Sequence, residues 1–398
     1  MQWIQDADQL LPELVQLRRA IHSEPELGLR TPKTAAKILA ALAGLPLEYR
    51  RGPSTDGIVA VLHGGRAGPT VLLRGDMDAL PMHEDTGLPF ASREAGAMHA
   101  CGHDSHVAML VGAARLLSAR RAELAGTVLF MFQPGEEGYH GARFMLEDGL
   151  LEPLPQAAFA LHVMPNAPHG MFTGREGPLL ASADTLRIEI TGRGGHASMP
   201  HDALDPIPIA CEIVTAIQTY VTRRMPASDP VVITIARIQA GTTDNVIPET
   251  ASLLGTIRTL SAANRAAVHT GLQTLATGIA AAHGAVAQVD IELGFPVTRC
   301  DGRAVALGRG VVEALYGAPT WIPLPAPVMG AEDFSYVLEK VPGAMFFLGA
   351  SAQGTDWRSC CGLHSNRMVI DETVMARGAA ALAGIAARFL DGTGGWPT

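Results

Sequence analysis

The chain has 398 residues, more than one hydrophobic core usually serves, so two domains are expected. Hydrophobic residues make up 47% and charged residues 17%, and the net charge of −9 argues against a nucleic-acid binder, which needs a basic surface. Five scattered cysteines, no secretory leader and no apolar run of membrane-spanning length lead us to expect a reduced, cytoplasmic setting.

The first part of the chain alternates short β-rich runs with a helical pattern. Strands are expected over residues 70–76, 127–133 and 157–163. Between the first two, apolar residues fall at helical spacing over 104–120, with Asp104 or Ser105 as the expected N-cap. This order predicts an α/β fold with a mainly parallel sheet flanked by helices.

The pattern changes near residue 182. Strand, helix, strand, strand, helix and strand follow one another over residues 185–191, 208–224, 230–238, 250–260, 263–284 and 287–295. This order is typical of a ferredoxin-like α+β unit. After Pro296 the α/β pattern resumes, with a strand over 344–350 and a helix over 372–390. We therefore expect a discontinuous catalytic domain of residues 1–181 and 297–398, and an inserted domain of residues 182–296.

Reactive side chains gather where the predicted strands of the larger domain end. In open α/β sheets, ligands bind beyond the carboxyl ends of the strands. The segments "RGDMD", "ACGHD", "QPGEEG", "ALHV" and "GLHSN" bring acids, imidazoles and one thiol to that edge: Asp76, Asp78, Cys101, His103, Glu136, Glu137, His162 and His364.

Two neighbouring carboxylates at the rim of an apolar core need a positively charged partner, and a divalent cation supplies one. A bridging ligand with two further ligands per ion can hold a pair of metals roughly 3.5–4 Å apart. A coordinated thiol is deprotonated and can bridge. The sequence predicts Cys101 as the bridge, with His103 and His162 on one ion and Glu137 and His364 on the other.

Mixed nitrogen, oxygen and sulfur ligands suit Zn²⁺ or a neighbouring transition metal such as Mn²⁺, with Co²⁺ and Ni²⁺ as alternatives, and exclude a pure Mg²⁺ or Ca²⁺ site. Asp78 is expected to accept a hydrogen bond from a ligating histidine and so to orient its ring, without binding a metal itself. Glu136 has no ligand role in this scheme. Because bound cations lower the pKa of water from about 15.7 toward 7, Glu136 is suited to accept its proton as general base in amide hydrolysis.

Two other classes of function compete with this interpretation. Cys101 could be the nucleophile of an amidase with His103 or His106 as its base, which would leave the acids and the other histidines without a role. A non-catalytic nucleotide-binding α/β protein is a further alternative, but the chain has no phosphate-binding loop of the form G-x-x-x-x-G-K-[ST].

The ordered motifs along the chain resemble the M20 metallopeptidase family, in particular its amidohydrolase branch of hippurate, N-acyl-amino-acid and auxin-conjugate hydrolases. The resemblance rests on "RRAIHSEPELG", "RGDMDALPMHEDTGLPFAS", "MHACGHDSHVAMLVGAARLL", "FQPGEEGYHGARFM", "ALHVMPNAPHG", "GRGGHASMPHDALDPI", "NVIPETASLLGTIRT", "MGAEDFSYVLEKVPG" and "LHSNRMVIDE". It implies the same five ligands, Cys101, His103, Glu137, His162 and His364, and the same base, Glu136.

The resemblance also implies roles for the inserted domain. His196 in "GRGGHAS" is expected to reach the active site of the partner subunit and to stabilise the oxyanion, while the domain supplies a dimer interface. Asn245 and Arg258 are weaker candidates for oxyanion contact and for recognition of a substrate carboxylate. The implied substrate is a small N-acyl amino acid, hydrolysed by a homodimer with two divalent metal ions per subunit. A dipeptidase or carboxypeptidase of the same family is the alternative.

Overall fold

The computed structural model describes residues 2–391 and 396, which form two compact units. Unit 1 contains residues 1–179, 299–326 and 333–398. Unit 2 contains residues 180–298 and 327–332. The expected domain boundaries, residues 1–181 with 297–398 and residues 182–296, stay a prediction.

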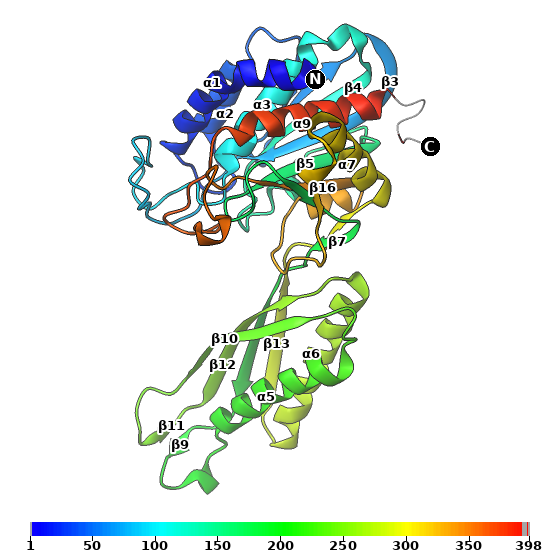
Figure 1. The fold of residues 1–398 in the computed structure, drawn as a ribbon. Helices are drawn as coiled ribbons and strands as arrows, with labels where there is room; N and C mark the ends of the chain where they lie inside the picture. The colour runs from blue at the N-terminus through cyan, green and yellow to red at the C-terminus, as the bar shows by residue number, and fades with distance from the viewer. Residues whose placement is uncertain (1, 392–395, 397–398) are drawn as a thin grey trace. The chain divides into compact units, whose positions relative to one another are not determined.

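Unit 1 is built around an eight-stranded sheet whose centre is parallel (Figure 1). Parallel pairing joins β4 to β3, β3 to β5 and β5 to β16, so these four strands end at one common edge. The outer strands β1, β2 and β6 add antiparallel pairs, and β15 pairs parallel to β6. In sheet order the strands are β1 (Glu48–Arg50), β2 (Ile58–His63), β4 (Ala125–Gln133), β3 (Arg66–Asp76), β5 (Ala157–Met164), β16 (Gly343–Gly349), β6 (Phe172–Gly174) and β15 (Trp321–Pro323).

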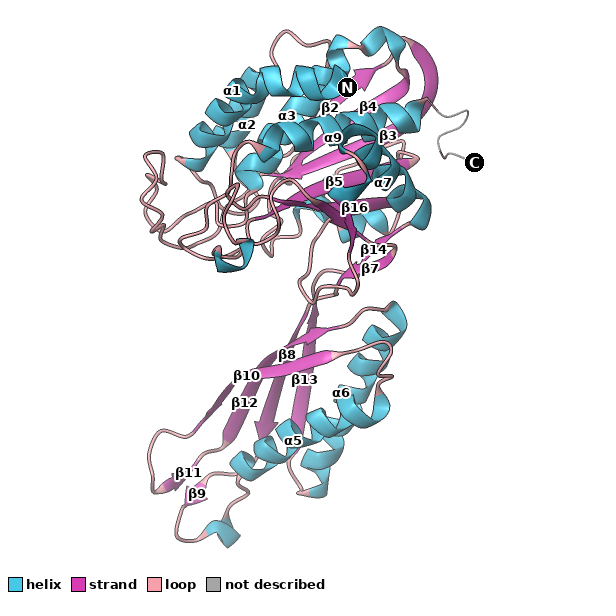
Figure 2. Ribbon diagram, viewed as in Figure 1, coloured by secondary structure: helices cyan, strands magenta, loops and turns pink. Residues whose placement is uncertain are grey.

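Helices pack against this sheet, with α1, α3 and α9 in mutual contact (Figure 2). Nearly every residue of α3 and α9 is buried, which matches their apolar composition. A β-carbon at Gly112 of α3 would lie 2.7 Å from the Ala379 β-carbon of α9, so a glycine permits the close approach of the two helices. The helices of unit 1 are α1 (Gln2–His22), α2 (Pro32–Ala41), α3 (His103–Ala119), α4 (Gly141–Glu147), α7 (Gly302–Tyr316), α8 (Ser335–Leu338) and α9 (Val374–Leu390), with 3-10 turns at Arg121–Glu123, Ala318–Thr320 and Trp357–Ser359.

Helix α3 begins at His103, two or three residues earlier than the expected N-caps imply. Its N-cap is Gly102, not Asp104 or Ser105, and the φ of +86° at Gly102 lies in the left-handed region that favours glycine. A β-carbon there would also lie 2.5 Å from the Val163 side chain. The expectation was wrong because capping propensity alone favoured the polar residues, whereas this backbone conformation and close packing require a glycine.

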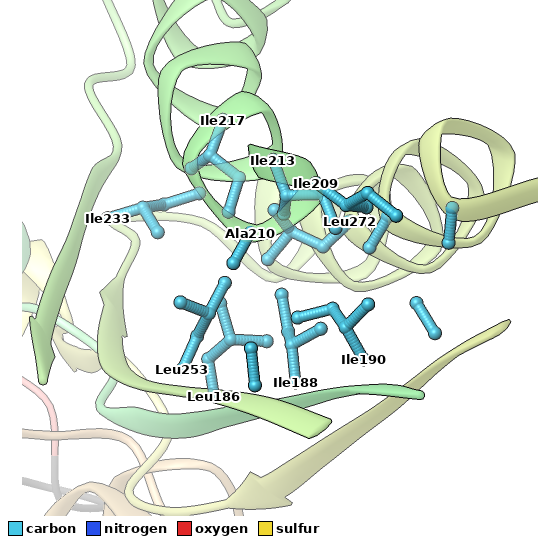
Figure 3. Packing of buried hydrophobic residues seen from close by; sticks show 14 of the residues in the cluster. Leu186, Ile188, Ile190, Ile209, Ala210, Ile213, Ile217, Ile233, Leu253 and Leu272 are labelled. Atoms are coloured by element: carbon cyan, nitrogen blue, oxygen red, sulfur yellow. The ribbon is translucent and has the colours of Figure 1, made fainter. Parts of the chain in front are cut away.

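Unit 2 has a four-stranded antiparallel sheet in the order β10-β12-β8-β13. Helices α5 and α6 cover one face of this sheet, and Figure 3 shows side chains such as Ile188, Ile213 and Leu253 meeting between the two layers. Strand β8 alternates buried and exposed residues because its other face is not covered by these helices. The elements are β8 (Asp184–Thr191), α5 (Pro206–Arg224), β10 (Val232–Ala240), β12 (Thr250–Arg258), α6 (Ala262–Ala282) and β13 (Val286–Leu293).

The remaining elements are short. Strands β9 (Gly195–His196) and β11 (Val246–Ile247) form a small ladder in unit 2, next to the 3-10 turn Pro200–Asp202. Strands β7 (Gly177–Leu180) and β14 (Thr298–Cys300) pair where the chain passes between the units.

The predicted fold class is confirmed: a mainly parallel α/β sheet flanked by helices, interrupted by a unit with the ferredoxin-like order of strands and helices. The sequence did not predict α1, α2, α7 or the outer strands of the large sheet. Within the described residues, the structure contains no helix that is both long and apolar enough to cross a membrane.

Substitution of a single helical glycine tests the packing of α3 on α9. Because Gly112→Ala places a methyl group against Ala379, we expect it to lower the free energy of unfolding by about 1–3 kcal/mol. The matched control is Gly310→Ala in α7, where no atom lies within 4 Å of the added carbon, and it should raise stability by about 0.4–1 kcal/mol. Chemical denaturation measures both changes, and equal effects of the two substitutions would contradict the described packing.

Candidate functional site

The predicted residues of the larger domain lie at the common carboxyl edge of the parallel strands. Asp78 follows β3, and Glu136 and Glu137 follow β4. His162 lies near the end of β5. Cys101 precedes α3, His103 is its first residue, and His364 comes from the loop between β16 and α9. All of these residues belong to unit 1.

Donor atoms of these side chains form two groups of three that share one thiol. Ligand atoms of Cys101, His103 and His162 lie within 4.8 Å of one another, and so do those of Cys101, Glu137 and His364. Cys101 Sγ is 3.4 Å from His162 Nε2, and His364 Nε2 is 3.3 Å from Glu137 Oε1. The structure therefore brings together all five residues that the sequence predicted as ligands.

Apart from the ion-pair contact of His364 with Glu137, two buried atoms of this cluster make no well-aligned hydrogen bond among the described residues: His103 Nε2 and Glu137 Oε1. They lie 4.0 Å apart. The opposite nitrogen of His103 donates to the Asp78 carbonyl oxygen at 2.9 Å, so its lone pair is on Nε2 when the ring is neutral. Two buried acceptor atoms this close repel each other unless a proton or a cation lies between them, and the N, O and S donors fit a transition metal or Zn²⁺.

The acidic side chains of the cluster favour protonation of two of its histidines. Burial opposes protonation of His103, but the negative charges of Asp76 and Cys101 outweigh it and raise the pKa of His103 well above its usual value. Hydrogen-bonding contacts with Cys101 and Glu137 raise the pKa of His364 to about 10. Burial raises the pKa of the Cys101 thiol. Protons on these groups must leave before a metal ion can bind, so metal affinity rises with pH.

Asp78 holds the two glutamates through their backbone. Its carboxylate accepts hydrogen bonds from the main-chain N–H groups of Glu136 and Glu137 at 2.9 and 3.1 Å. The contact with His103 runs mainly through the Asp78 carbonyl oxygen, because the nearest carboxylate oxygen is 3.5 Å from the ring nitrogen. The Asp78 carboxylate, which was expected to orient a histidine, thus fixes the Glu136–Glu137 loop instead.

A buried polar network that the sequence analysis missed supports the same loop. Arg74 bonds to Asp76, Gln133 and Asp333, and all four side chains are buried. Asp333 also accepts from Gln133 Nε2 at 2.7 Å and from the backbone N–H of Ala142 at 2.9 Å, so it links both ends of the segment that carries the glutamates. The signal was available: an arginine inside the apolar strand "TVLLRGD" requires buried acidic partners.

The other three predicted residues, His196, Asn245 and Arg258, lie in unit 2. His196 is exposed, and its Nδ1 accepts hydrogen bonds from the backbone N–H and the hydroxyl of Ser198 at 3.2 and 2.9 Å. The Asn245 carbonyl oxygen accepts from Ala197 N–H at 3.1 Å, so this residue supports the β9–β11 tip. Burial lowers the pKa of Arg258, which lies half-buried at the end of β12.

Comparison with known proteins decides the family. The model of Peptidase family M20/M25/M40 matches residues 72–388. The chain belongs to this family. An N-acetylcysteine deacetylase of Bacillus subtilis (strain 168) is 41% identical over 344 residues, which cover 86% of this chain and 89% of the relative. Thermostable carboxypeptidase 1 of Saccharolobus solfataricus is 37% identical, over 94% of this chain and 95% of the relative.

A solved structure, that of a dinuclear metal-binding peptidase of the M20 family from Bacillus subtilis, is also similar. It is 35% identical, covers 96% of this chain and 99% of its own, and superposes with a TM-score of 0.83. The M20 resemblance read from the motifs is confirmed, and this M20 chain is a hydrolase that acts on amide bonds. The nucleotide-binding alternative is thereby wrong.

Proposed function

We propose that this M20 enzyme hydrolyses the amide bond of N-acyl-L-amino acids, releasing a carboxylic acid and a free amino acid, with two divalent metal ions per subunit. The observation that carries the proposal is the pair of three-residue donor groups that share Cys101 beside a further carboxylate, Glu136. The deacetylase activity in the name of the Bacillus subtilis relative supports an acylated amino acid as the substrate.

Five side chains would hold the ions, namely Cys101, His103, Glu137, His162 and His364. Cys101 would be shared, with His103 and His162 on one side and Glu137 and His364 on the other. Zn²⁺ or Mn²⁺ fits the donor set, with Co²⁺ and Ni²⁺ as alternatives. When bound, the ions polarise the amide carbonyl and make water acidic enough to be deprotonated near neutral pH.

Glu136 is the proposed general base and acid. Its carboxylate accepts a proton from the water that attacks the acyl carbon, and delivers that proton to the nitrogen as the carbon–nitrogen bond breaks. Asp78 fixes its position by accepting hydrogen bonds from the backbone N–H groups of Glu136 and Glu137. One water is consumed, one C–O bond forms and one C–N bond breaks.

A Cys101-nucleophile amidase is less well supported by the same geometry. Burial raises the pKa of Cys101, whereas a nucleophilic cysteine needs a lowered pKa. His106 is not free to act as its base, because Nδ1 bonds to Asp76 and Nε2 accepts the N–H of Val163. A dipeptidase or carboxypeptidase activity is the closer alternative, supported by the name of the Saccharolobus relative.

Unit 2 is the proposed dimerisation and lid domain of a homodimer. The Ser198 N–H can only donate, so a neutral His196 accepts on Nδ1 and carries its proton on Nε2. This N–H is the proposed donor to the oxyanion in the partner's active site, and Arg258 is the proposed partner of the substrate carboxylate, with Asn245 as a further oxyanion contact. The five free thiols support a reducing, cytoplasmic setting.

A substrate panel tests the reaction class and the metal requirement together. Metal-stripped enzyme, reloaded with Zn²⁺, Mn²⁺, Co²⁺ or Ni²⁺, is assayed on acetyl, benzoyl and indole-acetyl amino acids and on dipeptides. We expect no turnover by the stripped enzyme, recovery on reloading, and a preference for acylated amino acids. Preferred cleavage of dipeptides would favour the peptidase alternative, and full activity without metal would refute the metal mechanism.

Two substitutions separate the base from the ligands. Glu136→Gln should keep its metal content and lose turnover about 10²–10⁴-fold, since only proton transfer is removed. Cys101→Ala should lose metal occupancy itself. The control is Glu147→Gln on the exposed surface of α4, which should change neither quantity. Metal analysis with steady-state kinetics measures both, and an active, fully loaded Glu136→Gln enzyme would contradict the assignment of the base.

Mixing of two inactive variants tests whether His196 acts across subunits. His196→Ala should lower kcat about 10²–10³-fold, while His201→Ala, an exposed histidine in the same tip, should leave it unchanged. Random exchange of subunits between His196→Ala and Glu136→Gln makes half of the dimers mixed, each with one complete site. Recovery of about one quarter of wild-type activity is expected. No recovery in a mixture shown to exchange would exclude action across subunits.

A further inference from the structure

Strand β5 continues beyond the point where its pairing with the neighbouring strand β3 ends. Pairing of β5 with β3 ends at Ala160, while pairing with β16 continues to Met164. Val163 therefore has no partner on β3, and two imidazoles form hydrogen bonds with its main-chain N–H and carbonyl groups. Its N–H donates to His106 Nε2 at 2.9 Å, and its carbonyl oxygen accepts from His162 Nδ1 at 2.7 Å.

These bonds fix where the protons lie on both rings. A carbonyl oxygen can only accept, so His162 carries a proton on Nδ1 and presents the lone pair of Nε2 toward Cys101 Sγ, 3.4 Å away. A backbone N–H can only donate, so His106 is neutral at Nε2 and carries its proton on Nδ1. That proton is donated to Asp76 Oδ1 at 2.5 Å.

Asp76 is itself held in place at the base of the cluster. It is fully buried and bonds through its second oxygen to Arg74, which in turn bonds to Asp333 and Gln133. His106 is 2% exposed, and its ring lies 4.5 Å from that of His162, centroid to centroid. A buried chain of hydrogen bonds thus runs from Arg74 through Asp76 and His106 to the main chain of Val163, whose carbonyl oxygen accepts from His162.

We propose that His106 is a positioning residue, which fixes the main chain at Val163 through its N–H and thereby the Val163 carbonyl that sets the orientation and proton arrangement of the metal-binding His162. This inference rests on the proposed function. Asp76 and the Val163 N–H occupy both ring nitrogens of His106, so neither nitrogen is left to bind an ion. It replaces the missing strand partner of β5, and supporting groups of this kind typically change metal affinity 10–100-fold when they are removed.

Two substitutions each preserve the hydrogen bond of one His106 ring nitrogen and remove that of the other. In His106→Gln the side-chain amide reaches the place of Nε2, so it can accept the Val163 N–H but loses the bond to Asp76. In His106→Asn the amide overlays Nδ1, so it keeps a donor for Asp76 but leaves the Val163 N–H without an acceptor. Both changes replace the same buried imidazole with a side-chain amide, so each variant is the other's control.

The readouts are metal affinity and the visible absorption of the Co²⁺-loaded protein, together with the melting temperature of the metal-free protein. We expect His106→Asn to lose about 10–100-fold in affinity for one of two ions and to change the Co²⁺ spectrum, with a smaller loss in His106→Gln. Wild-type affinity and spectrum in both variants, or equal losses in both, would overturn the proposal, because a merely structural ring would lower both melting temperatures without this split.

A measurement on the unaltered protein keeps the test independent of whether the variants fold. Nitrogen-15 NMR of metal-free wild-type enzyme should show His106 and His162 both protonated on Nδ1, and an Nε2–H form of His106 would overturn the inference. Failure of the proposed function is distinguishable, because the wild type would then bind no pair of Co²⁺ ions while these proton positions remained as described.

Discussion

The cost of burying charge away from water determines how the site is arranged. Two acids at the carboxyl edge of the sheet have dedicated partners: Asp76 has Arg74 and His106, and Asp78 has the backbone N–H groups of the glutamate loop. His103 Nε2 and Glu137 Oε1 form no hydrogen bond beside the buried thiol of Cys101, although each has an ion-pair contact, with Asp76 and His364 respectively. These two donor atoms, together with the thiol, are the groups that a bound cation would satisfy.

Much of this site could be predicted from the sequence because a parallel sheet converts chain order into position. The ends of β3, β4 and β5 meet at one edge, so Asp78, Glu137 and His162 could be assigned to one cluster without knowledge of the loops. Helices α5 and α6 were equally accessible, because apolar residues at helical spacing are bounded by clear start and stop signals.

The other features of the site depend on individual hydrogen bonds and packing contacts, which produce no periodic pattern in the sequence. Whether Asp78 contacts a histidine with its carboxylate or with its carbonyl oxygen is decided by the local path of the backbone. The start of α3 is set by packing of Gly102 against Val163, which are far apart in sequence. His106 looked like a base for Cys101 because both lie in one motif, yet its two nitrogens are used by Asp76 and by the end of β5.

His364 has an unusual backbone, with a φ of +63° that costs a residue other than glycine roughly 1–2 kcal/mol. Its N–H donates to the Ala100 carbonyl oxygen at 2.8 Å, so the main chain is tied directly to the residue before Cys101. The half-exposed turn that precedes it, including Trp357 and Cys361, is therefore not what locates the imidazole. A change in the sequence or length of that turn would therefore alter the exposed surface beside His364, while the hydrogen bond to Ala100 would still hold the main chain of His364 next to Cys101.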